Sequence, residues 1–162
     1  MSRMQSLKKP LGATLLGGLF FAGTSSAQNV TTEILEDAQN LSDRWVHYGR
    51  NYGAWRYMPD DQINRETVKD LSPVWIKQTG VTGGAFEVTA LVNDGRMYLT
   101  TANSHLMVVD PMTGAELWRY DHNFEDVDLC CGPHNRGVAL YEDMVFYGTL
   151  DAHLMAFDAA TG

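Results

Sequence analysis

Apolar residues recur in short runs along most of the chain, and polar or glycine-containing turns separate the runs. Eight such runs are rich in valine, tyrosine, phenylalanine and threonine: PVWIKQ, EVTALV, RMYLTT, HLMVVD, LWRY, GVALY, DMVFYG and HLMAFD. The breaks between them include NDG, PMTG, YED and LDA. Short runs of β-forming residues between tight-turn signals are typical of antiparallel strands joined by hairpins. The pattern therefore predicts an all-β protein.

One stretch near the start of this region departs from the strand pattern. In TTEILEDAQN, the apolar residues Ile34, Leu35 and Ala38 follow the spacing of one helix face. Thr32 can cap the helix through its hydroxyl group, and acidic residues follow it near the positive end of the helix dipole. We therefore expect a short helix that ends near Asn40.

The strand pattern also repeats along the chain. Residues 97–114 (MYLTTANSHLMVVDPMTG) align without a gap on residues 145–162 (VFYGTLDAHLMAFDAATG), at an offset of 48, and seven of the 18 positions are identical. A period of about 40–50 residues with about four strands in each unit is the signature of a β-propeller blade. We therefore expect about two propeller blades.

The first copy of the repeat continues into a second motif, DPMTGAELW. Asp110 and Gly114 suit a tight turn, and Trp118 follows on a strand where it can be buried. The second copy reads DAATG and reaches Gly162 before its tryptophan. Because known propellers close with four to eight blades and an open pair leaves sheet edges exposed, we expect an incomplete propeller that is truncated within a blade motif.

Residues 1–27 have the pattern of a secretory signal peptide. Three basic residues precede the apolar run Leu11–Gly23, which is short of the roughly 20 residues that span a bilayer. Small residues then precede Gln28, so we expect cleavage after Ala27 and a mature segment of residues 28–162. An uncleaved N-terminal anchor is the alternative. Cleavage would place the mature segment in an oxidising compartment.

Charge narrows the range of partners. The chain carries 12 lysines and arginines against 20 aspartates and glutamates, a formal net charge of −8. The expected leader holds three of the basic residues and no acidic one, so the mature segment would carry −11. No basic stripe is present, and we therefore expect no binding of nucleic acid. The acidic segment YDHNFEDVD lacks the spacing of a calcium loop, and we interpret it as a solvated loop.

The only two cysteines, Cys130 and Cys131, are adjacent in DLCCGPHNRG. In an oxidising compartment we expect a vicinal disulfide, with two free thiols or an intermolecular bridge as the alternatives. Such a disulfide closes a tiny loop and adds little stability through chain entropy, so its expected use is local, as a rigid and polarizable surface. Arg136 follows on the same segment and suits the carboxylates of a planar ligand. A surface salt bridge is the alternative for this arginine.

The histidines give weaker signals. His105 and His153 occupy the same position of the repeat, which favours a structural role within a blade over metal ligation. His47, His122 and His134 have no partner that the sequence can assign.

Three of these segments together resemble the pyrroloquinoline quinone (PQQ)-dependent alcohol dehydrogenases, which include the methanol and ethanol enzymes. RWVHYGRNYGAWRYMPDDQINRETVKDLSPVW is similar to the N-terminal signature of the family, DLCCGPHNRGVALY to its vicinal-cysteine segment, and DPMTGAELW to its tryptophan-docking motif. The resemblance covers essentially the whole of residues 28–162. It implies an eight-bladed quinoprotein propeller, of which this chain would be the N-terminal part.

The resemblance also implies a cofactor site. Cys130 and Cys131 would form a platform for PQQ, and Arg136 would bind or polarise the quinone. Glu87, in FEVTAL, matches a glutamate that contacts PQQ, although Ala90 stands where the family pattern has proline. The catalytic aspartate, the stacking tryptophan and the ligands of a calcium or lanthanide ion are expected beyond the end of this chain.

A protein of this family would oxidise primary alcohols to aldehydes in the periplasm and pass electrons to a cytochrome c or haem partner. Peripheral membrane association would fit such electron transfer. The 162-residue chain alone is expected neither to hold PQQ tightly nor to turn over. The alternative is a non-catalytic propeller of the outer-membrane assembly type, which binds proteins and needs neither adjacent cysteines nor the pair Glu87 and Arg136. A sugar dehydrogenase of the same quinone class is a nearer alternative, but it generally lacks the vicinal cysteines.

Overall fold

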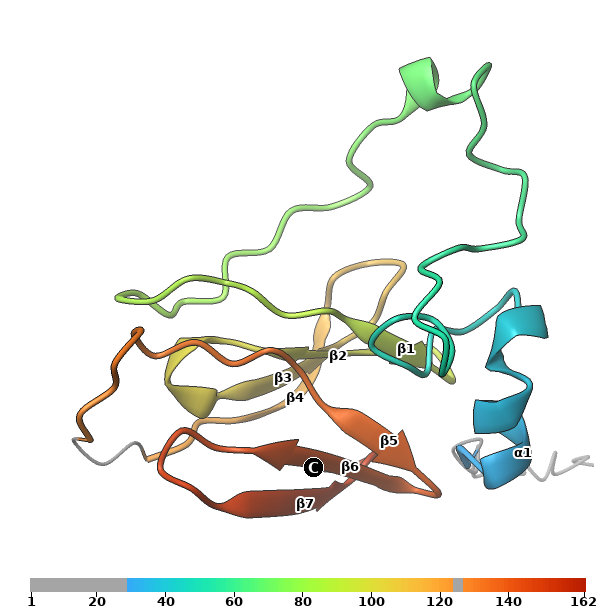
Figure 1. The fold of residues 1–162 in the computed structure, drawn as a ribbon. Coiled ribbons are helices and arrows are strands. Elements are labelled where there is room, and N and C mark those ends of the chain that lie inside the picture. The colour runs from blue at the N-terminus through green and yellow to red at the C-terminus, as the bar shows by residue number, and fades with distance from the viewer. Residues whose placement is uncertain (1–28, 124–126) are drawn as a thin grey trace, which may run out of the picture.

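The computed structural model describes residues 29–123 and 127–162 and has an almost entirely β architecture (Figure 1). Within these residues, the strands form two antiparallel sheets, in the orders β1-β2-β3-β4 and β5-β6-β7. The sheets lie face to face, as expected for neighbouring propeller blades. The signal peptide expected at residues 1–27 lies outside the described residues. The described part contains no helix with the length and apolar character to cross a membrane.

Most strand boundaries follow the predicted runs closely, but the run EVTALV (residues 87–92) forms a strand only from Leu91, because residues 87–90 belong to no sheet. The first sheet comprises β1 (Leu91–Asn93), β2 (Arg96–Thr100), β3 (Leu106–Val109) and β4 (Glu116–Tyr120), and the second comprises β5 (Ala139–Tyr141), β6 (Met144–Gly148) and β7 (Leu154–Asp158). Tyr98 of β2 pairs with Val108 of β3, and at the corresponding positions of the second copy Phe146 of β6 pairs with Ala156 of β7. The sequence repeat is therefore a repeat of one hairpin in one register.

The core lies between the two sheets. The residues that the two sheets contribute to it and that are at most 2% exposed are Leu91, Tyr98, Leu106, Val108 and Val145, and the N-terminal segment adds the equally buried Val30, Ala38 and Val46. Side chains alternate across each strand, so the strand residues among these share the inner faces. The burial of this apolar surface is the main force that holds the sheets together.

Trp118 links the sheets as the docking motif predicts. Its indole Nε1 donates a hydrogen bond to the carbonyl of Ala159 at 3.2 Å, and the ring covers Gly162, where a Cβ atom would lie 2.8 Å from Cε3. Trp75 makes the equivalent contacts one repeat earlier. Its Nε1 donates to the carbonyl of Pro111 at 2.9 Å, and its ring covers Gly114.

The predicted strand at residues 73–78 (PVWIKQ) is wrong, because this segment has no sheet partner in the described structure. Val74 and Ile76 are 82% and 87% exposed, and only Trp75 packs against the first sheet. The apolar pattern resembles that of β4, but a strand also needs a neighbour that satisfies its backbone groups. The segment instead belongs to a long irregular arm, residues 46–90, which carries the 3-10 turn η2 (Val68–Asp70). Much of this arm extends away from the sheets (Figure 1).

The predicted helix is present and short. Helix α1 (Thr32–Glu36) is followed by the 3-10 turn η1 (Ala38–Asn40), where Ala38 is fully buried. The N-cap is Thr31 and not Thr32, because the Thr31 hydroxyl accepts the backbone N–H of Ile34 at 3.4 Å. The helix therefore begins one residue earlier than a cap at Thr32 would imply.

Candidate cofactor site

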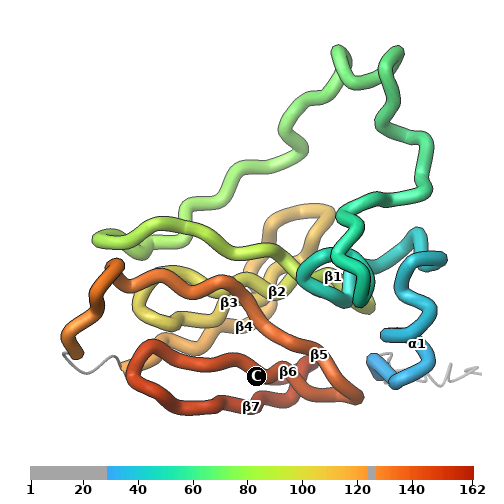
Figure 2. Tube along the Cα trace, in the orientation of Figure 1, coloured from blue at the N-terminus to red at the C-terminus, as the bar shows by residue number. Residues whose placement is uncertain are grey.

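Two irregular segments carry the predicted site residues, and they run side by side. The first is residues 84–89, which precede β1, and the second is residues 130–137, which precede β5. Figure 2 shows both segments passing along the same edge of the two sheets. The backbone N–H of Thr89 donates to the carbonyl of Arg136 at 3.4 Å and joins them.

Glu87 and Arg136 form an ion pair, with 3.1 Å between Oε2 and Nη2, which is also the surface salt bridge expected as the alternative for Arg136. The two residues are distant in sequence, and the resemblance assigned both of them to the same cofactor. The Arg136 side chain is 71% exposed, so most of its N–H donors still face solvent and are available to a ligand. The Glu87 side chain is half as exposed, at 35%, and its charge is balanced by the guanidinium.

Cys130 and Cys131 are exposed free thiols, and their Sγ atoms lie 2.8 Å apart. A disulfide is about 2.05 Å long, so the expected bond is not made in this structure and stays a prediction. The thiol of Cys130 raises the pKa of the Cys131 thiol through their hydrogen bond. Both sulfur atoms lie on the exposed side of the loop, where a planar ligand could reach them.

Asn135 anchors the cysteine segment to the second sheet. It is 7% exposed, its Nδ2 donates to the carbonyl of Gly148 at 2.9 Å, and its Oδ1 accepts the N–H of Gly137 at 3.1 Å. Pro133 adds a second anchor, because its carbonyl accepts the N–H of Asn103 at 3.2 Å. Asn103 lies in the tight turn η3 (Ala102–Ser104), between β2 and β3. The sequence analysis did not single out Asn135, although it stands next to Arg136.

The residues present fit a flat polyanion such as PQQ. Arg136 offers exposed donors that match carboxylates and quinone oxygens. The Cys131 thiol, with its raised pKa, adds no negative charge that would repel such a ligand. Gly132, with φ of 91°, allows the left-handed backbone conformation of this loop. The donor set therefore suits the cofactor that the resemblance implies.

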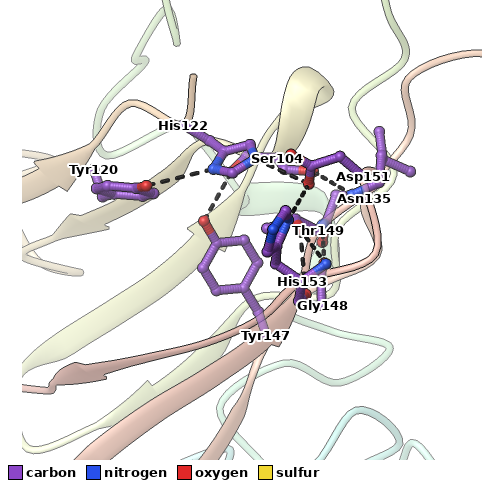
Figure 3. A network of polar contacts seen from close by, with 10 residues as sticks. Ser104, Tyr120, His122, Asn135, Tyr147, Gly148, Thr149, Asp151 and His153 are labelled. Atoms are coloured by element: carbon purple, nitrogen blue, oxygen red, sulfur yellow. Dashed lines mark hydrogen bonds and ion pairs between the residues drawn. The ribbon is translucent and has the colours of Figure 1, made fainter. Parts of the chain in front are cut away.

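A second polar cluster joins the two sheets at another place (Figure 3). The Nε2 atom of His122, which follows β4, lies 2.9 Å from Asp151 Oδ2, and both side chains are 8% exposed. His153 Nδ1 lies 3.3 Å from the Oδ1 atom of the same carboxylate. A hydrogen bond from Thr149, and then those from His122 and His153, hold the pKa of Asp151 well below its usual range.

The sequence analysis found no partner for His122 and did not single out Asp151. Among the described residues, no group of histidine, cysteine, aspartate and glutamate side chains is arranged to hold a metal ion. Because His122 follows β4 of the first sheet and Asp151 precedes β7 of the second, we interpret the cluster as a contact between blades. The acidic segment predicted to be a solvated loop lies partly outside the described residues, which omit positions 124–126.

A hollow on the described surface lies apart from the predicted site residues. It has a volume of about 630 Å³ and lies between the irregular arm and the outer face of the first sheet. Its lining is mainly apolar and includes Trp75, Phe86, Met97, Leu99 and Met107. The four predicted site residues, Glu87, Cys130, Cys131 and Arg136, do not line this hollow, and we do not assign the cofactor site to it.

Known proteins resemble this chain in both sequence and structure. The quinoprotein alcohol dehydrogenase PedH of Pseudomonas putida is 40% identical over 98% of this chain, which spans 27% of that relative. The dehydrogenase subunit of the alcohol dehydrogenase (quinone) of Komagataeibacter europaeus is 38% identical over the whole chain, which spans 22% of it. The chain thus covers about a quarter of the length of these curated relatives.

Two solved structures agree with this relationship. The quinohemoprotein alcohol dehydrogenase ADHIIG of Pseudomonas putida matches 84% of this chain with a TM-score of 0.76 and 33% identity, over 20% of its own length. The quinohemoprotein alcohol dehydrogenase of Comamonas testosteroni matches 80% of this chain with a TM-score of 0.71 and 37% identity, also over 20% of its length. The family model for the β-propeller domain of PQQ-dependent glucose, ethanol and alcohol dehydrogenases matches residues 45–162. The chain therefore belongs to the PQQ-dependent dehydrogenase β-propeller family.

Proposed function

We propose that this chain is the N-terminal part of a periplasmic quinoprotein that oxidises primary alcohols to aldehydes with PQQ. Electrons would pass to a cytochrome c or haem partner. The relatives support this proposal, because they are quinoprotein and quinohemoprotein alcohol dehydrogenases. The observation that carries it is the contact between Glu87 and Arg136 on the segments that also bear the adjacent cysteines. A non-catalytic propeller would not need this contact.

The residues of this chain would bind and orient the cofactor. Arg136 would donate its free N–H groups to a carboxylate or quinone oxygen, and its ion pair with Glu87 would fix the direction of the guanidinium. Cys130 and Cys131 would support one face of the ring system. When bound, PQQ supplies an electrophilic quinone that accepts two electrons from the alcohol.

Further properties belong to the same proposal. Residues 1–27 would direct export and be removed, and Cys130 and Cys131 would then be oxidised to a vicinal disulfide. The free thiols already lie 2.8 Å apart, so little movement is needed. A calcium or lanthanide ion would be held by residues outside this chain. A europium-containing methanol dehydrogenase that matches 80% of the chain, with a TM-score of 0.68, supports the lanthanide as one option.

Reconstitution of the full-length protein tests the function. The cofactor-free protein would be mixed with PQQ and either calcium or lanthanum, and dye-linked oxidation of ethanol and 1-butanol would be followed. Arg136→Met should weaken PQQ binding by about 10- to 100-fold, because a charged hydrogen bond contributes about 1.5–3 kcal/mol. Arg136→Lys keeps the charge and should lose less. The proposal fails if the unaltered protein binds no PQQ with either metal ion.

The chain alone provides a separate test of its expected inactivity. Equilibrium dialysis of the purified 162-residue chain against PQQ and calcium should show no tight binding. Micromolar binding together with dye-linked alcohol oxidation would refute the expectation that later blades complete the site.

A further inference from the structure

Three contacts join the two segments of the candidate site, residues 84–89 and 130–137. The backbone N–H of Ala85 donates to His134 Nδ1 at 3.3 Å, the Glu87 carboxylate pairs with the Arg136 guanidinium, and the N–H of Thr89 donates to the Arg136 carbonyl. The contacts therefore follow one another in the same direction along both segments. Of the three contacts, the one made by His134 lies nearest in sequence to the cysteines.

The imidazole of His134 contacts both segments. The backbone N–H of His134 donates to the carbonyl of Gly132 at 2.9 Å, so the ring lies over this glycine, and a Cβ atom there would be 3.0 Å from Nε2. On the other segment, a Cβ atom at Gly84 would lie 2.5 Å from the Cβ of Ala102 and 3.0 Å from Pro133 Cγ. Glycine at positions 84 and 132 therefore leaves room for Pro133 and for the His134 ring, which a larger residue would displace.

The contact needs an acceptor at one ring atom. Because a backbone N–H can only donate, Nδ1 must carry a lone pair, and a neutral imidazole then has its proton on Nε2. Residues 84–89 belong to no sheet, so no ladder of backbone bonds fixes them. The His134 acceptor is therefore one of three contacts that set where this segment lies relative to its neighbour.

We propose that His134 is a positioning residue of the cofactor site. By accepting the N–H of Ala85, it holds the segment of Glu87 in register with the loop of Cys130 and Cys131. The carboxylate, the guanidinium and the two sulfur atoms are then placed to meet one planar ligand. This inference deepens the proposed function and rests on it.

Two variants of similar shape separate the acceptor from the bulk of the side chain. His134→Leu removes the acceptor, whereas His134→Asn places Oδ1 at the same number of bonds from the backbone as Nδ1. Both would be made in the full-length protein. In the cofactor-free protein, hydrogen exchange of the Ala85 amide should speed up about threefold to tenfold with leucine, the range expected for one net hydrogen bond, and asparagine should restore the protection.

The affinity for PQQ provides the second readout. The dissociation constant, measured by fluorescence quenching in the presence of calcium, should rise about threefold to tenfold with leucine and stay near the unaltered value with asparagine. Equal exchange of the Ala85 amide in all three proteins would overturn the contact itself. Lost protection without a change in PQQ affinity would overturn the positioning role.

The two measurements distinguish failure of the proposed function from failure of the His134 contact. If the unaltered protein bound no PQQ, the function and the positioning role would both fall, while the exchange of Ala85 would still report whether the contact exists. If the leucine variant did not fold, as judged by circular dichroism, His134→Ala carries the same expectations.

Discussion

Trp118→Phe tests how strongly the docking tryptophan holds the two sheets together. The change keeps an aromatic ring but removes Nε1, whose hydrogen bond to the Ala159 carbonyl is worth about 1 kcal/mol net. The smaller ring also leaves a gap over Gly162, where the indole is in close contact, at a cost of about 1–2 kcal/mol. Together these losses predict a destabilisation of about 2–3 kcal/mol.

The assay is urea unfolding of the full-length protein, followed by circular dichroism, with Trp55→Phe as the matched control. Trp55 undergoes the same chemical change, but its side chain lies on the surface and is 68% exposed. The control should shift the free energy of unfolding by no more than about 0.5 kcal/mol. If both variants unfold at the same urea concentration, the inference that Trp118 ties the blades together is wrong.

Three further changes test other contacts. Asp151→Asn should reduce the dependence of stability on acid pH. Because the pKa of Asp151 is lowered in the folded protein, its carboxylate stabilises the fold above about pH 4, and this stabilisation is lost as the pH falls towards the folded pKa. The free energy of unfolding of the variant should therefore change less with pH in acid. Burial raises the pKa of Tyr98 to about 12, so stability should fall as the pH rises from about 10 towards 12, and Tyr98→Phe should reduce this alkaline loss in a thermal unfolding series. Asn135→Ala should lower stability by about 1–2 kcal/mol in urea and weaken PQQ binding several-fold, because it frees the cysteine segment from the Gly148 carbonyl; unchanged PQQ affinity would show that this anchor is dispensable.

The hairpins were predictable because their information is local. Alternating apolar residues and turn signals lie within a few positions of one another, so the strands β2, β3, β6 and β7 and their shared register could be inferred from the repeat. The segment PVWIKQ carries the same local pattern, yet a strand depends on a partner that the pattern does not encode. The cap was misplaced by one residue because Thr31 and Thr32 are adjacent and offer the same hydroxyl group.

The site was predictable only in part. The resemblance pointed to Glu87 and Arg136, and the structure brings them into contact from two segments that are distant in sequence. The pair of His122 and Asp151 was missed because it forms between two loops that carry no motif. A signal was present all the same. Asp151 replaces Asn103 in the second copy of the repeat, which adds a negative charge where the first copy has a neutral side chain.

The equivalent contacts of Trp75 and Trp118 have a consequence for how such a molecule can grow. The unit of the first sheet contains both the indole of Trp118, which bonds to the next unit, and the Pro111 carbonyl, which accepts the indole of Trp75. A tandem duplication of one such unit would therefore supply both the indole donor and the turn carbonyl that accepts it. The new copy could then make the same hydrogen bonds to the units before and after it without any compensating substitution. Enlargement by whole units should be well tolerated, whereas an insertion of a few residues between Asp110 and Gly114 would separate the carbonyl from the glycine on which the ring rests.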